Sequence, residues 1–199
     1  MNVALRRPMS FDEFLAWERQ QELRWEFDGF HPVAMVGGTV EHSVIATNLV
    51  RALEDRLRGK TCRAFRGDLK IFVAGRVRYP DAVVTCTPVP RGTDVVPDPV
   101  VVFEVLSAST AATDRIAKNE EYRLTPSITR YVMLEQTSQA ATVFARAGDD
   151  WVGHVITGDA LLAMPESGVE LPLPELYANI NLGPNDAPGN TPDNTPNGG

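Results

Sequence analysis

The sequence predicts an α/β fold in which a central mixed β-sheet is flanked by α-helices. Residues 100–106 (VVVFEVL) are almost continuously apolar, which is typical of a central strand buried on both faces. Apolar residues between positions 41 and 57 recur at helical spacing. A strand-helix-strand unit over residues 100–134 lies beside tightly connected strands, so the sheet should contain both parallel and antiparallel pairs.

An N-terminal helix and a β-hairpin precede this core. Residues 10–13 read Ser-Phe-Asp-Glu, a capping-box pattern that marks the start of a helix. The β-type segments 24–27 and 30–36 then flank Asp28-Gly29, a dipeptide typical of hairpin turns. We therefore expect two short antiparallel strands after the first helix.

The remaining elements follow from the same kinds of pattern. The helix over residues 41–57 should end at Gly59, and another helix is expected over residues 113–124. Besides the central strand, the sequence contains further short β-type segments: 62–65, 69–73, 81–86, 131–134, 140–145 and 151–156. Residues 1–182 are expected to form a single domain. Residues 183–199, rich in Pro, Asn and Gly, are expected to form a disordered tail.

The charge of the chain limits its partners. A net charge of -7 argues against a protein that coats nucleic acid non-specifically. However, residues 51–78 carry nine basic and three acidic side chains, so a local basic face could still meet phosphate groups. For each individual arginine, the alternative of a solvated surface residue remains open.

The sequence predicts a cytoplasmic protein with no membrane contact. No run approaches the roughly 18 apolar residues that a membrane-spanning helix needs. The first ten residues lack the apolar centre of a signal peptide. In the cytoplasm, Cys62 and Cys86 should be reduced core residues.

Two carboxylates lie beside or within apolar segments, where burying a charge costs free energy. Asp81 stands directly before an apolar β-type run, and Glu104 lies inside the most apolar run of the chain. A buried carboxylate must be paired, protonated or bound to a metal ion. Two carboxylates on separate strands of one sheet suit Mg²⁺ or Mn²⁺, because such ions bind carboxylates together with water and phosphate oxygens. A bound ion can activate water for attack on a phosphodiester.

Lys118 adds a cation to this pair. It lies on the predicted helix 113–124, from which its ammonium could reach back to the sheet and stabilise a charged transition state. The series of Pro80-Asp81, Glu104 and a nearby lysine resembles the PD-(D/E)XK nuclease superfamily. In the simple motif the lysine lies two residues after the glutamate, where this chain has Leu106.

A set of collinear motifs extends the resemblance over about residues 8–182. These motifs are Trp25-Glu26-Phe27-Asp28-Gly29, Glu41-His42, Arg78-Tyr79-Pro80-Asp81, Phe103-Glu104-Val105-Leu106-Ser107 with Ser109-Thr110, Lys118 with Tyr122, and Arg130-Tyr131-Val132. In them the sequence is similar to the Uma-two family of restriction-endonuclease-like proteins, in which the lysine has moved to the next helix.

The resemblance implies a restriction endonuclease-like core and a defined site. By it, Asp81 and Glu104 would be metal ligands, aided by the Val105 carbonyl, and Lys118 would be the catalytic lysine. Two further residues would line the site, and the whole implied catalytic set is Asp81, Glu104, Lys118, Glu26 and His42.

These observations predict a metal-dependent endonuclease that hydrolyses phosphodiester bonds in DNA. The alternative is a catalytically inert nuclease-like fold that serves as a nucleic-acid-binding or protein-interaction module. A small-molecule phosphoesterase would share the same site. A homodimer would place two sites for a double-strand cut, although nothing in the sequence defines the oligomer.

Simpler roles remain open for the two carboxylates. Asp81 could cap a strand or pair with Arg78 or Lys70. Glu104 could form a buried salt bridge with Lys118, which would explain both residues without a metal ion.

Overall fold

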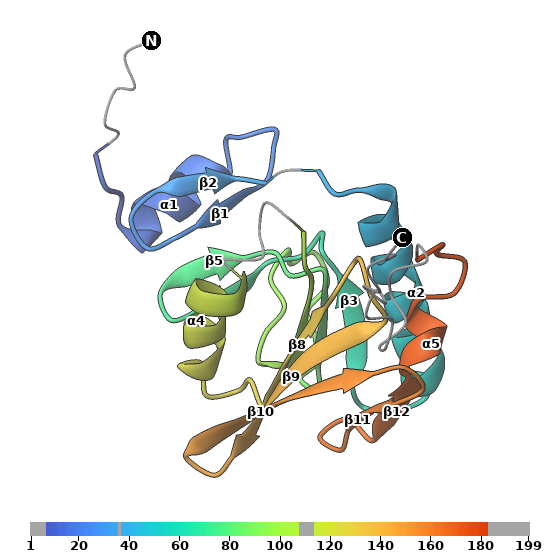
Figure 1. Ribbon diagram of the computed structural model, residues 1–199. Helices are drawn as coiled ribbons and strands as arrows, with labels where there is room; N and C mark the ends of the chain where they lie inside the picture. Colours follow the sequence, from blue (N-terminus) through green and yellow to red (C-terminus); the bar gives the residue numbers. More distant parts are fainter. Residues whose placement is uncertain (1–6, 36, 108–113, 183–199) are drawn as a thin grey trace, which may run out of the picture.

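The structure of the chain, a computed structural model, describes residues 7–35, 37–107 and 114–182 (Figure 1). Its centre is a six-stranded sheet, whose strands are β3 (Arg63–Arg66), β6 (Ala82–Thr85), β7 (Pro99–Val105), β8 (Arg130–Leu134), β9 (Ala140–Ala147) and β10 (Asp150–Thr157). They lie in the order β10-β9-β8-β7-β6-β3. Strands β7 and β8 run parallel, and the other neighbouring pairs are antiparallel. The sheet is mixed, which confirms the predicted fold class.

Strand β7 is the predicted central strand and is buried along nearly its whole length. Its side chains alternate between the two faces of the sheet. Val101, Phe103 and Val105 belong to one apolar core, whereas Val102 belongs to the other. Burial of each such side chain stabilises the fold by roughly 1.5–3 kcal/mol. Glu104 shares the face of Val102, so its carboxylate points into a mainly apolar layer.

The first core lies beneath α2 (Val40–Leu57), the helix that the apolar spacing predicts. Its N-terminus is capped by Thr39, whose hydroxyl accepts a hydrogen bond from the backbone N–H of His42 at 3.2 Å. This side of the sheet also carries β11 (Leu161–Met164), β12 (Val169–Pro172) and α5 (Leu173–Leu176). The sequence does not predict these three elements, because each is only four residues long and prolines interrupt the pattern.

The second core is covered by a π-helical turn, η1 (Asp114–Lys118), which continues into α4 (Asn119–Arg123). The two together confirm the predicted helix over most of residues 113–124. Tyr122 of α4 is fully buried, and its ring packs edge-on against Tyr131 of β8. Single π-helical turns are rare and occur frequently at functional sites. The motif residues Ser109 and Thr110 and the predicted tail 183–199 lie outside the described residues.

A four-stranded antiparallel sheet lies at the N-terminal end of the molecule (Figure 1). It has the order β2-β1-β5-β4 and consists of β1 (Trp25–Phe27), β2 (Pro32–Ala34), β4 (Ile71–Val73) and β5 (Arg76–Arg78). The predicted capping box begins α1 (Phe11–Glu18), whose Phe14 ring stacks on Phe27. The predicted hairpin is also present, with Phe27 paired to Pro32. Strand β5 was not predicted, because it is only three residues long and two of them are arginines.

Two features bear on the predicted compartment. Cys62 and Cys86 form a disulfide at the end of the β3–β6 pair, so the prediction of reduced cysteines is wrong. Their separation of 24 residues in sequence gives no sign of this pairing, which the antiparallel register creates. Disulfides are rare in cytosolic proteins. Within the described ranges, no helix has the length and apolarity required to span a membrane.

Candidate active site

Strands β6 and β7 bring Asp81 and Glu104 to the same end of the central sheet. Ala82 of β6 lies opposite Phe103 of β7, so Asp81, one residue before β6, reaches the level of Glu104. The Oδ2 atom of Asp81 accepts a hydrogen bond from the backbone N–H of Val105 at 2.7 Å. The cost of placing a carboxylate at this position is therefore offset in part by a main-chain donor.

His42 is the side-chain partner of Asp81. Its Nε2 lies 3.1 Å from Oδ1 of Asp81, and about one fifth of each side chain is exposed. Gly38 makes room for the ring, because a Cβ at that position would lie only 2.8 Å from Nδ1 of His42. The two partners that the sequence suggested for Asp81 are engaged elsewhere: Arg78 with Glu26 and Glu121, and Lys70 with Glu18 and Asp94.

Glu104 is nearly fully buried and receives two donors from the helix above it. Lys118 Nζ lies 2.9 Å and the Tyr122 hydroxyl 2.8 Å from its Oε1 atom. A spacing of four residues places both donors on the same side of the junction between η1 and α4. Burial raises the pKa of the Tyr122 phenol well above its usual value, and the charge of Glu104 raises it further, so Tyr122 remains a hydrogen-bond donor at neutral pH.

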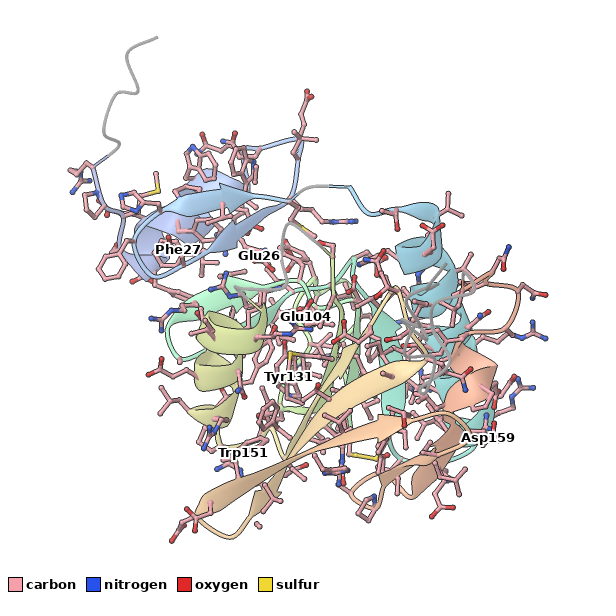
Figure 2. The ribbon with its side chains drawn as sticks, in the orientation of Figure 1. Glu26, Phe27, Glu104, Tyr131, Trp151 and Asp159 are labelled. Atoms are coloured by element: carbon pink, nitrogen blue, oxygen red, sulfur yellow. A yellow bond between two sulfur atoms is a disulfide. The ribbon has the colours of Figure 1, made fainter. Side chains whose placement is uncertain are left out.

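Glu26 of β1 lies on the other side of Lys118. Its Oε1 atom is 3.6 Å from the Lys118 ammonium and accepts the backbone N–H of Tyr79 at 3.1 Å. The same ammonium therefore lies between two carboxylates from different sheets. Figure 2 shows Glu26 and Glu104 near each other, where the four-stranded sheet meets the six-stranded sheet.

Arg78 and Glu121 support this arrangement, and sequence reasoning assigned neither of them a place in the site. The guanidinium of Arg78 binds both oxygens of Glu121 at 2.7 Å and Oε2 of Glu26 at 3.0 Å. Both Arg78 and Glu121 are buried. Burial alone would lower the pKa of Arg78, but the Glu121 hydrogen bonds and the charge of Glu26 raise it overall. The sequence signal that could have identified them is that Arg78 begins the motif Arg78-Tyr79-Pro80-Asp81 and that Glu121 directly precedes the motif residue Tyr122.

An open cleft of about 570 Å³ reaches the site from solvent. Its lining residues are Arg24, Gly38, Thr39, His42, Ser43, Ala46, Arg66, Gly67, Asp68 and Asp81. Asp81 and His42 thus face the cleft, whereas Glu26, Glu104 and Lys118 are not among its lining residues. The structure places all five sequence-predicted catalytic residues in one connected region, with Asp81 and His42 on its solvent side.

The described residues contain no group of three or more His, Cys, Asp or Glu side chains arranged to hold a metal ion. A cation at this site would depend on Asp81, Glu104, main-chain oxygen and water. That donor set is made of hard oxygen atoms, which is the preference of Mg²⁺.

Comparisons with known proteins agree with this fold. The model of the Uma2 family, described as "Putative restriction endonuclease", matches residues 11–174. The chain is 35% identical over 176 residues to the uncharacterized protein slr1290 of Synechocystis sp. PCC 6803, covering 86% of this chain and 93% of that one. It is 26% identical over 166 residues to sll1609 of the same organism, covering 80% and 93%.

A solved structure shares the fold. It is the crystal structure of "a putative nuclease belonging to DUF820" from Anabaena variabilis, with a TM-score of 0.71, 20% identity, and coverage of 85% of this chain and 98% of that one. Because the family model spans most of the chain, including each of the five residues discussed above, the resemblance seen in the motifs is confirmed. The chain belongs to the Uma2 family of restriction endonuclease-like proteins.

Proposed function

We propose that this protein is a metal-dependent endonuclease that hydrolyses phosphodiester bonds in DNA. The observation that carries the proposal is the position of Asp81 and Glu104 at adjoining strand ends, with the Lys118 ammonium 2.9 Å from Glu104. An acid pair next to an ammonium combines metal ligation with stabilisation of a negatively charged transition state.

Asp81, Glu104 and the Val105 carbonyl would hold Mg²⁺ or Mn²⁺. When bound, the ion would lower the pKa of a water molecule and neutralise charge on the phosphate. The hydrogen bond from the Val105 N–H fixes the Asp81 carboxylate against β7, which suits a ligand that must keep its orientation. The fit is one of donor chemistry, since Mg²⁺ commonly takes one or two protein carboxylates and completes its shell with water.

Lys118 would orient the attacking water and stabilise charge that develops on the phosphate oxygens. Its ammonium has three donors, and the contacts at 2.9 Å to Glu104 and 3.6 Å to Glu26 hold it in place. Glu26 would act as a positioning carboxylate. His42 faces the cleft and would contact water or phosphate through its imidazole.

The first prediction tests this assignment. Asp81→Asn, Glu104→Gln and Lys118→Met should each lower cleavage of a plasmid in Mg²⁺ by at least about 100-fold, because each removes a group that acts on the transition state. Asp159→Asn is a matched control, because Asp159 is exposed and lies far from Glu104 (Figure 2). Cleavage at the wild-type rate by the Asp81 or Glu104 variant would overturn the proposal.

A second candidate function is an inert module that binds nucleic acid or protein. The Glu104–Lys118 ion pair favours it, because that pair neutralises the buried carboxylate without any metal ion. Calorimetric titration with Mn²⁺ separates the two candidates. A nuclease should bind the ion and lose it in Glu104→Gln, whereas an inert module should give no heat in either protein.

Three further expectations from the sequence remain predictions. They are a homodimer, a cytoplasmic location, and a single domain with a tail beyond residue 182.

A further inference from the structure

Two arginines line the cleft beside Asp81 and His42. Arg24 directly precedes β1 of the four-stranded sheet, and Arg66 is the last residue of β3 in the six-stranded sheet, so the two side chains come from separate parts of the fold. Both side chains are exposed. The cleft that they share, at about 570 Å³, is much larger than one phosphate group.

Both guanidiniums lack a direct polar contact with the described residues. Within the part of the chain that the structure describes, neither Arg24 nor Arg66 forms a salt bridge or a side-chain hydrogen bond. Other arginines do: Arg56 pairs with Glu175 and Arg130 with Glu166. Asp68 lines the same cleft, only two residues from Arg66, yet no salt bridge joins them.

The acidic groups of the cleft leave these charges available. Asp81 already accepts the Val105 N–H and contacts His42, so its charge is engaged within the site. Asp68 is exposed, and exposed pairs are worth little in water. A planar guanidinium matches phosphate oxygens in two parallel hydrogen bonds, which makes arginine well suited to this ligand.

We propose that Arg24 and Arg66 bind the phosphates on either side of the scissile bond, and that the ligand of the cleft is therefore a nucleic-acid backbone rather than a small phosphate ester. This inference rests on the proposed function of the Asp81–Glu104 site. A small ester has its one phosphate at that site and leaves both guanidiniums without a partner. A polynucleotide presents further phosphates at regular intervals along the cleft.

The test compares matched arginine variants. Arg24→Gln and Arg66→Gln are paired with Arg19→Gln and Arg63→Gln, since Arg19 and Arg63 are exposed, lie near the first two in sequence and do not line the cleft. Binding of a fluorescent 20-base-pair duplex is measured by anisotropy in EDTA at several salt concentrations. Hydrolysis of the duplex and of bis(4-nitrophenyl) phosphate is measured in Mg²⁺.

We expect each cleft variant to weaken duplex binding about tenfold and to reduce the slope of log K against log salt by about one, with both controls near wild type. The ratio of kcat/KM for the duplex to that for the small diester should also fall about tenfold. Equal losses in the cleft variants and the controls would overturn the inference. So would equal losses on the two substrates, which would place the arginines at the scissile phosphate.

The same experiments distinguish failure of the nuclease proposal from failure of the inference about Arg24 and Arg66. If wild-type protein hydrolyses neither substrate, the nuclease proposal fails, and the binding data alone decide on Arg24 and Arg66. A wild-type protein that hydrolyses the small diester but does not bind the duplex would overturn this inference and leave the catalytic site standing.

Discussion

Two buried ion-pair clusters in this molecule are built differently. The Glu18 cluster consists of Glu18, Lys70, Tyr79 and Asp94. Glu18 accepts the Lys70 ammonium and the Tyr79 hydroxyl, each at 2.6 Å, and Asp94 contacts Lys70 from an exposed position. In this cluster one buried carboxylate contacts one buried ammonium, and this ion pair connects α1 to the segment before β4.

The Glu104 cluster consists of Glu26, Glu104 and Glu121 with Arg78 and Lys118. Three carboxylates, all at most 13% exposed, contact the buried Arg78 and Lys118 and the partly exposed Arg76, whose Nε lies 3.1 Å from Glu121. The Lys118 ammonium is divided between Glu26 and Glu104. Asp81 adds another negative charge next to it. The Glu18 cluster therefore joins two parts of the fold through one buried pair. In the Glu104 cluster one ammonium is shared by two buried carboxylates beside Asp81, an arrangement that fits the metal site proposed above.

A glutamate-to-glutamine substitution in each cluster should give the largest difference in the free energy of unfolding. Glu18→Gln should lower the free energy of unfolding by about 3 kcal/mol, because Lys70 loses its buried counter-charge and keeps only the contact with Asp94, whose side chain is 71% exposed. Glu104→Gln should lower it by less than about 1 kcal/mol, because the amide oxygen can still accept from Tyr122 and Lys118 keeps Glu26. Urea denaturation measures both values. Equal losses would show that the two clusters are energetically alike.

A smaller effect is expected from replacing the arginine that binds two carboxylates. Arg78→Lys should destabilise the fold by about 2 kcal/mol, since an ammonium cannot bind Glu121 with two parallel hydrogen bonds and also reach Glu26. It should also lower kcat about tenfold with little change in KM, because Glu26 positions Lys118.

Arg130→Lys is the matched control for that variant. Arg130 binds Glu166 through two hydrogen bonds of 2.6 and 3.1 Å, outside the Glu104 cluster. It should lose stability and retain kcat. A normal kcat in Arg78→Lys would remove Arg78 and Glu26 from the catalytic arrangement.

The smallest expected effect is a pH dependence of the stability that the Glu18 cluster contributes. Burial alone would lower the pKa of Lys70, but its hydrogen bonds to Glu18 and Asp94 raise it above the usual 10.5. A raised pKa gives stability that is complete below 10.5 and disappears as the pH rises through the folded-state value. The stability advantage of wild type over Lys70→Met should therefore be constant from about pH 7 to about pH 9 and shrink above 10.5. Denaturation across this range measures it, and an advantage that persists unchanged to about pH 12 would contradict the prediction.

The sequence predicts the helices and the long strands because their patterns are local. The apolar run of β7, the capping box of α1 and the spacing in α2 each depend on neighbouring residues. The Cys62–Cys86 bond and the His42–Asp81 contact could not be predicted from patterns, because each depends on which elements become neighbours in space. Asp81 and Glu104 could be identified because they are charged residues beside or within apolar segments of the sequence. Only the fold shows which residues contact each of them.

Leu106 occupies the position at which the simple nuclease motif has its lysine. Leu106 lies two residues after Glu104, is buried in the same core as Tyr122 and donates its backbone N–H to Leu134 of β8. Side chains two apart on a strand share a face, so a lysine at position 106 and Lys118 would approach Glu104 from the same side of the sheet. Under the proposed function the reaction would require an ammonium at one point in space, and a chain of this fold could supply it either from β7 or from the helix above it. A search for distant relatives should therefore use the place of the charge relative to Glu104 and not its order in the sequence.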